Sequence, residues 1–166
     1  MRHLFSFLLS LILLGCAATI YKPLKINGVS FVASGQSIDS SNVMPVVNVN
    51  SNYAAVMPFG FIRNLEHPEI VHNTERQWFG ETRAGAKQYI EELRKERINV
   101  MIKPQIWVHK GEFTGLIKME NEANWKLLEN SYTSFIMEYA ELADEVNAEI
   151  FCIGTELENF TKYRPE

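Results

Sequence analysis

Short apolar segments alternate with longer amphipathic segments along this chain. Four segments are short and mostly apolar, and each is predicted to be a strand: 29–33, 53–59, 99–104 and 149–153. Their apolar residues are nearly continuous rather than alternating, which is typical of parallel strands covered on both faces. The pattern therefore predicts a series of strand–helix units.

Two helices are predicted between these strands. Thr82 can cap a helix over 83–97, where apolar residues recur at helical spacing. A second helix, over 122–146, carries a longer apolar stripe at three- and four-residue steps. The polar, Asn-rich stretch 40–51 is expected to hold a short helix or a turn, and 60–82 and 105–115 are predicted to be loops.

Strands separated by helices imply right-handed crossovers and parallel pairing. Four such units amount to half of a (β/α)8 barrel, and an open doubly wound sheet is the alternative. That alternative usually shows a glycine-rich phosphate turn after its first strand, and this sequence has none there. The predicted fold is therefore α/β, a TIM-barrel type truncated after strand 4, or half-barrel.

The first sixteen residues have a different pattern. Arg2 and His3 precede an apolar run from Leu4 to Leu14, which is shorter than the about 20 residues that a membrane-spanning helix needs. This run is typical of a signal peptide. The ending at Gly15 and Cys16 resembles a bacterial lipoprotein box, in which the Cys thiol is acylated, and a plain signal peptide or a short uncleaved anchor is the alternative.

Three segments follow from this pattern: a lipoprotein signal peptide over 1–15, a lipidated N-terminus and tether over 16–27, and a half-barrel over 28–166. We expect a protein of the bacterial cell envelope, anchored to a membrane through lipid on Cys16 and facing the periplasm or the cell surface. If Cys16 carries lipid, Cys152 has no partner for an intrachain disulfide. Because Cys152 lies in an apolar strand, it is expected to be a small buried thiol.

Composition narrows the function classes. The net charge is −4 and no basic stripe is visible, so nucleic acid is not an expected partner. The histidines are scattered rather than paired at metal-ligand spacing, and no cofactor or metal is expected. A Gly-x-Ser-x-Gly nucleophile elbow is also absent from the sequence.

Candidate chemistry gathers where the predicted strands end. In a parallel barrel the functional residues lie at the carboxyl ends of the strands, and Glu156 directly follows the fourth strand. The loops after the strands are rich in aromatic residues, which suit either stacking against a sugar ring or ordinary packing. From the sequence alone, Glu156 is equally well explained as a surface carboxylate in a salt bridge.

Three segments carry a family resemblance. The motif Lys-Pro-Gln-Ile-Trp-Val over 103–108, the aromatic stripe from Trp125 to Tyr139, and Phe-Cys-Ile-Gly-Thr-Glu-Leu over 151–157 look like glycoside hydrolase family 113. That family belongs to a clan of retaining (β/α)8 glycosidases, and its known members are endo-β-1,4-mannanases. The similarity covers roughly 27–166, which corresponds to the first half of the family's barrel.

The resemblance implies roles for individual residues. Glu156 matches the clan's general acid/base, which must be protonated near neutral pH and therefore needs a raised pKa. Many members have Asn just before this Glu, contacting the sugar 2-hydroxyl, where this chain has Thr155. The expected substrate contacts are Lys103, Trp107, His109, Thr155 and Glu158.

The clan's nucleophile is a Glu after strand 7, and the strands predicted here number four. The expected function is therefore a retaining, β-mannanase-like glycoside hydrolase fragment that carries the acid/base but lacks the nucleophile and is inactive by itself. Its expected substrate is a β-mannan-like polysaccharide or oligosaccharide. The alternatives are a non-catalytic glycan-binding lipoprotein, an inactive decayed hydrolase, and a half-barrel that closes by dimerising.

Overall fold

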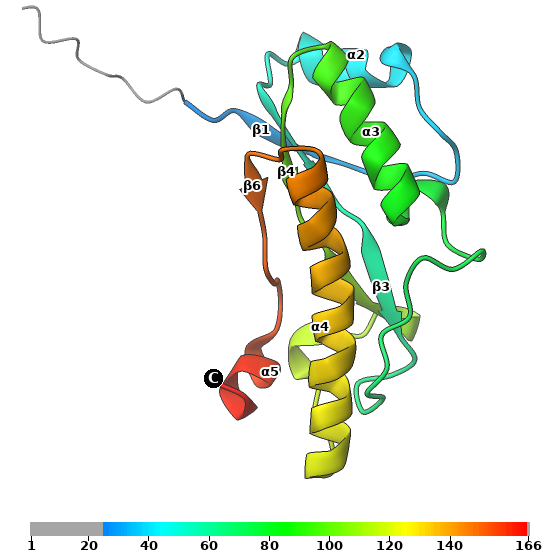
Figure 1. The fold of residues 1–166 in the computed structure, drawn as a ribbon, viewed down its shortest axis with the longest axis vertical. Helices are drawn as coiled ribbons and strands as arrows, with labels where there is room; N and C mark the ends of the chain where they lie inside the picture. The colour runs from blue at the N-terminus through cyan, green and yellow to red at the C-terminus, as the bar shows by residue number, and fades with distance from the viewer. Residues whose placement is uncertain (1–24, 166) are drawn as a thin grey trace, which may run out of the picture.

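The structure is a computed structural model that describes residues 25–165 (Figure 1). The signal-peptide segment 1–15 and Cys16 lie outside the described residues, so both remain predictions. Within 25–165, no helix combines the length and the apolarity needed to cross a membrane. The elements follow in the order β1 Gly28–Phe31, α2 Ser40–Asn48, β2 Tyr53–Val56, β3 Phe59–Ile62, η2 Phe79–Glu81, α3 Arg83–Lys95, β4 Asn99–Ile102, β5 Gln105–Val108, η3 His109–Gly111, η4 Thr114–Leu116, α4 Glu122–Glu145, β6 Ile150–Phe151 and α5 Glu158–Tyr163.

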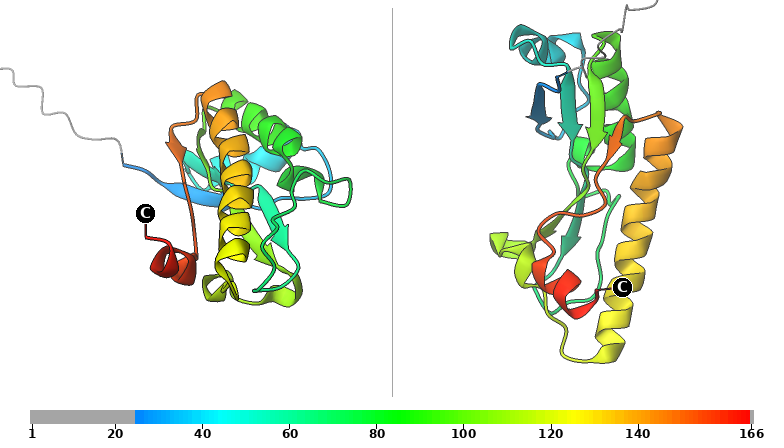
Figure 2. Two further views of the ribbon diagram at one scale, coloured as in Figure 1. Left: turned by 60° about the horizontal axis from the view of Figure 1, so that its bottom comes forward. Right: turned by 90° about the vertical axis from the view of Figure 1, so that its left-hand side faces the viewer.

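The strands form a parallel sheet in the order β1-β2-β4-β6, and β3 and β5 form a second parallel pair. Helices α3 and α4 cover one face of this sheet (Figures 1 and 2). Parallel strands joined through helices on one face are the repeating unit of a (β/α)8 barrel. The described residues thus confirm the predicted half-barrel, in which β1 and β6 each pair on one side.

The core lies between the sheet and its helices. Alternate strand residues such as Val56, Val100 and Ile102 are almost fully buried on that side. Tyr89 and Leu93 of α3 and the α4 residues Leu128, Phe135, Tyr139 and Leu142 pack against them. The opposite face of the sheet corresponds to the barrel interior, and its side chains are only half-buried.

Both long helices begin and end where local chemistry predicts. The Thr82 hydroxyl accepts a hydrogen bond from the backbone N–H of Gly85 at 3.1 Å, as an N-cap does. Asn121 caps α4 in the same way through the N–H of Asn124 at 2.9 Å. Beyond the C-caps, Arg97 and Asn147 adopt left-handed backbone with φ of 59° and 50°, a conformation that stops a helix.

The second and third predicted strands, 53–59 and 99–104, continue further along the chain than the sequence suggested. The predicted loops 60–82 and 105–115 begin with strand residues, because β3 and β5 continue β2 and β4 beyond Pro58 and Pro104. Tyr53 pairs with Asn99, and the same offset of 46 residues (99 − 53 = 46; 105 − 59 = 46) persists beyond the prolines. The prediction that these segments are entirely loop was therefore wrong.

Pro58 explains why each long strand is divided. The backbone N–H of Lys103 donates to Val56 O at 2.9 Å, and that of Gln105 donates to Pro58 O at 3.0 Å. In a parallel ladder, residue 58 would donate the intervening bond to Lys103 O, but proline has no N–H. One bond is lost, while the bonds on either side hold the register.

Pro104 explains why β6 is short. The Cys152 N–H donates to Ile102 O at 2.9 Å, so the ladder between β4 and β6 reaches that point. The next donor toward β6 would be residue 104, which as proline has none. The predicted strand 149–153 is therefore confined to Ile150–Phe151, and the segment beyond Cys152 leaves the sheet.

Candidate active site

An apolar row crosses the interior face of the β3–β5 pair. Phe61 lies opposite Trp107 in register and forms an antiparallel bridge with Val71 on its other side. Because cross-strand partners point to the same face, these three side chains lie side by side. The side chains of Trp107 and Val71 are 51% and 53% exposed. The Phe59 ring packs edge to face against Trp107, with ring centroids 6.4 Å apart. The row therefore presents flat apolar surface to solvent.

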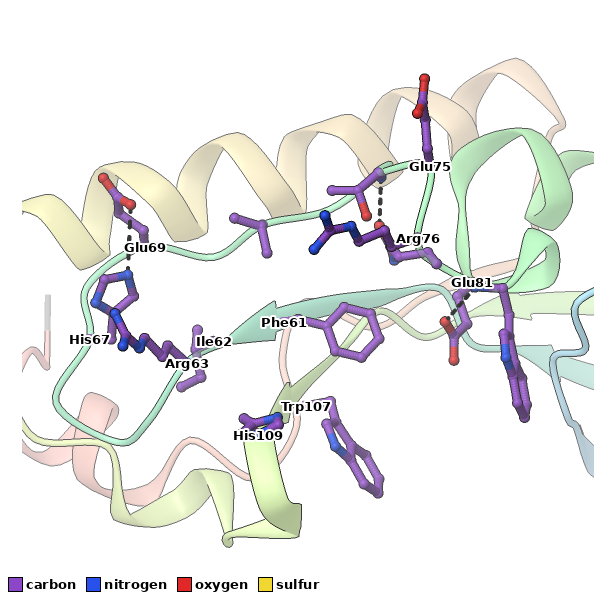
Figure 3. Close-up of a pocket in the computed structure, with 14 residues that line it drawn as sticks. Phe61, Ile62, Arg63, His67, Glu69, Glu75, Arg76, Glu81, Trp107 and His109 are labelled. Carbon is purple, nitrogen blue, oxygen red and sulfur yellow. Dashed lines mark hydrogen bonds and ion pairs between the residues drawn. The ribbon is translucent and has the colours of Figure 1, made fainter.

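Polar groups stand beyond this row, toward the ends of the strands. Arg63 follows β3 directly and His109 follows β5. From the returning loop, Glu69 lies 3.7 Å from the His67 ring. Figure 3 shows these polar groups around the apolar surface that Phe61 and Trp107 provide. An aromatic surface beside hydrogen-bonding groups suits a ligand with one apolar face and many hydroxyls, such as a sugar.

The loop between β3 and α3 closes this surface into a cleft of ≈1080 Å³, here called the first cleft. Arg76 and Glu81 reach into it from that loop, whereas the Glu75 carboxylate points away (Figure 3). Burial raises the pKa of Glu81, although a hydrogen bond from the Trp78 N–H acts in the opposite direction. The first cleft thus contains a carboxyl group that binds protons more readily than an exposed Glu.

A second cleft, of ≈950 Å³, contains the candidate acid. It lies between α4 and the segment that leaves β6, and it is lined by Thr155, Glu156 and Glu158. Glu156 is exposed and its backbone is left-handed, with φ of 54°. Such a conformation is uncommon for a residue with a side chain and clusters at functional sites.

Glu158 connects the segments that follow β5 and β6. It opens α5, which packs against η4 in the loop after β5. A Cβ at Gly115 would lie 2.0 Å from the Glu158 Oε2, so glycine at 115 leaves room for this carboxylate. The Thr155–Glu158 segment is thereby held next to the loop that follows His109.

The predicted site residues fall into two groups. Trp107 and His109 line the first cleft, and Thr155, Glu156 and Glu158 line the second. Lys103 lines neither cleft; it is half-buried between β4 and β5. The two clefts share no lining residue.

Glu81 of the first cleft was not predicted from sequence. It lies in the predicted loop 60–82, whose aromatic residues, including Trp78, were expected to stack against a sugar or to pack, and only the fold brings Glu81 to the strand ends. The capping pattern at Thr82 was the available signal, because it fixes this segment at the start of α3 and hence near the barrel rim.

The fold and clefts together define a class. Parallel strand–helix units with hollows at the carboxyl ends of the strands are the architecture of (β/α)8-barrel enzymes, whose sites lie at that rim. A family model described as Glycoside Hydrolase Family 113 matches residues 33–165. The chain belongs to this family.

Solved structures agree on the fold. The GH113 β-mannanase AaManA from Alicyclobacillus acidocaldarius, in complex with ManMIm, matches with a TM-score of 0.75 at 19% identity, over 84% of this chain and 47% of that chain. A complex of a GH113 β-1,4-mannanase matches with a TM-score of 0.72 at 16% identity, over 84% of this chain and 48% of that one. The chain thus spans about half the length of these structures. No curated protein sequence matches the chain.

Proposed function

We propose that this chain is the acid/base half of a retaining β-mannanase-like glycoside hydrolase. The observation that carries the proposal is the position of Glu156, at the exit of the fourth barrel strand in a chain of family 113. Two of the solved structures matched in fold carry the name β-mannanase or β-1,4-mannanase. A β-mannan-like polysaccharide or oligosaccharide is accordingly the proposed substrate.

The chemistry needs two carboxyl groups in different roles. Glu156 donates its proton to the glycosidic oxygen as the bond from that oxygen to the sugar C1 breaks, and a second carboxylate forms a covalent bond to C1. Water then attacks C1, the bond to the second carboxylate breaks, and Glu156 takes a proton from the water. In this proposal the second carboxylate comes from strand 7 of the complete barrel and not from this chain.

The first cleft supplies the proposed binding surface. Trp107 offers an exposed indole face, while Arg63 and His109 lie where they can donate hydrogen bonds to hydroxyls. Thr155 precedes the acid and offers a hydroxyl in place of the amide that many members of the clan have there. Lys103 and Glu158 complete the proposed set of contacts.

The hydrolase proposal is tested with Glu156→Gln in the full-length protein. Gln has nearly the same shape but no proton to donate, so kcat on mannan should fall by about 10²-fold or more. Glu141→Gln is the matched control, because Glu141 is an exposed residue of α4 that lines neither cleft. Hydrolysis of mannan that survives Glu156→Gln would contradict the assignment.

A second candidate function is glycan binding without hydrolysis. The separation of the two clefts favours it, because the first cleft presents its aromatic surface without Glu156. Calorimetric titration of the protein with mannooligosaccharides tests this function. Trp107→Ala should weaken binding about tenfold through lost stacking, whereas Phe113→Ala, a comparably exposed aromatic outside both clefts, should not. Binding by a protein that never hydrolyses the glycan would favour this candidate.

We also propose that lipid on Cys16 anchors the protein to the bacterial cell envelope. The basic start, the short apolar run and the Gly15–Cys16 ending support this proposal. Growth with an alkyne-tagged fatty acid should label the protein and place it in the membrane fraction. Cys16→Ser should abolish the label, and an unlabelled wild-type protein would refute the anchor.

A further inference from the structure

The turn that carries Glu156 is held from α4 by one side chain. The Tyr132 hydroxyl donates a short hydrogen bond to the backbone carbonyl of Ile153, where the chain leaves β6. The Tyr132 ring packs against the rings of Phe135 and Phe160, with ring centroids 6.4 Å and 5.5 Å away, respectively. Burial, with a smaller contribution from Cys152, raises the pKa of Tyr132 to about 12, so the hydroxyl remains a neutral donor at any pH of interest.

The residues next to this hydrogen bond leave room for it and hold the adjoining backbone. A Cβ at Gly154 would lie 3.0 Å from the Tyr132 hydroxyl oxygen and 3.0 Å from Leu157 Cδ1, so glycine permits the close approach. On the other side, the Cys152 thiol donates to the Gly154 carbonyl at 3.4 Å. Two consecutive peptide units before Thr155 and Glu156 are therefore oriented by side chains.

This support bears on the backbone of Glu156. A left-handed φ is unfavourable for a residue with a Cβ and persists only where the surrounding structure determines it. At Glu156, φ is 54°. The peptide units that follow Ile153 and Gly154 are oriented by side chains and are separated from Glu156 only by Thr155, so they constrain the direction in which the chain presents the carboxyl group.

We propose that Tyr132 is a positioning residue for the acid/base Glu156. It does not touch the substrate; it fixes the Ile153–Glu156 turn and hence the place from which the proton is donated. This inference rests on the proposed hydrolase function and names a residue on α4 that the reaction depends on. General acid assistance requires hydrogen-bond reach to the leaving oxygen, so a small displacement of the turn weakens it.

A displaced acid has a recognisable kinetic signature. A leaving group of low pKa departs without a proton, whereas one of high pKa needs the acid. Tyr132→Phe removes only the hydroxyl and keeps the ring between its aromatic neighbours. In the full-length protein, kcat/KM for a phenyl β-mannobioside should fall about tenfold, and that for the dinitrophenyl analogue should change less than about twofold.

The matched control is Tyr163→Phe on α5. Its hydroxyl makes no hydrogen bond within the described residues, and the residue lines neither cleft. Both substrates should react with this variant as with the wild type. An equal loss of kcat/KM on the two substrates in Tyr132→Phe would show a merely structural role and overturn the proposal.

A second measurement is independent of activity. Hydrogen–deuterium exchange should show faster exchange of the amides at 154–157 in Tyr132→Phe than in the wild type or in Tyr163→Phe. Unchanged exchange there would also overturn the proposal. A wild-type protein that hydrolyses no mannoside refutes the proposed hydrolase function instead, and the exchange result still decides whether Tyr132 holds the turn.

Discussion

Glu149 joins three elements at the start of β6, and replacing it with Gln is a sharp test of how the sheet is held. One carboxylate oxygen accepts a hydrogen bond from the Arg94 guanidinium on α3, and the other accepts from the backbone N–H of Val100 on β4 at 2.8 Å. Arg94 also donates to Asn147 O at 2.8 Å. The carboxylate therefore takes the place of a ladder bond where β6 begins.

The effect of Glu149→Gln follows from these contacts. Burial by itself would raise the pKa of Glu149, but the hydrogen bonds from Arg94 and Val100 outweigh it and lower the pKa from 4.5. Hydrogen bonds to charged groups contribute about 1.5–3 kcal/mol, and exposed ion pairs less than about 1 kcal/mol. Because both side chains are about 30% exposed, we expect a loss of about 1–2 kcal/mol at pH 7, or about 2–8 °C in Tm.

The pH dependence is the decisive part. A carboxyl group whose pKa is lowered by folding adds stability above its unfolded pKa, and that stability is lost as pH falls through the folded pKa. The difference in Tm between wild type and Glu149→Gln should therefore be full at pH 7 and shrink toward zero below about pH 4. Differential scanning calorimetry of the full-length protein measures both values.

Glu145→Gln is the matched control for this experiment. Glu145 also pairs with cations, Arg83 and Lys87, but it accepts from side chains only and lies in solvent. Its replacement should shift Tm less than that of Glu149. A Tm difference for Glu149→Gln that is the same at pH 7 and pH 3, or absent at pH 7, would refute the reasoning.

Two further predictions concern packing. Gly85→Ala should destabilise the protein by about 3 kcal/mol or more, because its Cβ would lie 1.8 Å from the backbone oxygen of Phe79. Gly35→Ala is the control and should change Tm little, because its Cβ would meet only an ordinary contact at 3.9 Å. Equal Tm values for the two variants would contradict this prediction. Arg164→Ala should speed amide hydrogen exchange in α5. Arg164 follows α5 and links it to α4, because it pairs with Glu129 at 2.9 Å and lies 5.4 Å from the centre of the Trp125 ring. Unchanged exchange across 158–163 would show that the aromatic contacts alone hold α5.

The half-barrel and its two long helices could be predicted because their signals are local. Apolar stripes at helical spacing and a cap at Thr82 depend on a few neighbouring residues, and α3 and α4 end within about two residues of the predicted positions. The short helix α2 lies within the stretch 40–51, where a helix or a turn was expected. The helix α5 was not predicted, because its six residues are held by contacts with η4 and by the packing of Phe160 against Trp125 and Tyr132 of α4 rather than by their own pattern.

The strand continuations were missed because proline was interpreted as an end. Pro58 removes one bond from a ladder whose neighbouring bonds survive, so the register continues through it. A single sequence does not show that two prolines will lie opposite each other across a pair of strands. Tyr132 belongs to the apolar stripe predicted over 122–146, but its bond to Ile153 O depends on how α4 lies against β6, which the stripe does not show.

Pro104 relates the two clefts to each other. The N–H groups of its neighbours Lys103 and Gln105 donate to Val56 O and Pro58 O and keep β5 in register with β3, which carries Trp107 and His109 past the end of the four-stranded sheet. Its missing N–H faces β6, so that strand leaves the sheet after Cys152 and turns at Gly154 to present Glu156. If position 104 could donate to Cys152 O, the ladder between β4 and β6 would gain the next bond. This residue without a donor thus lies where β5, which carries Trp107, and the segment that carries the candidate acid Glu156 cease to be paired.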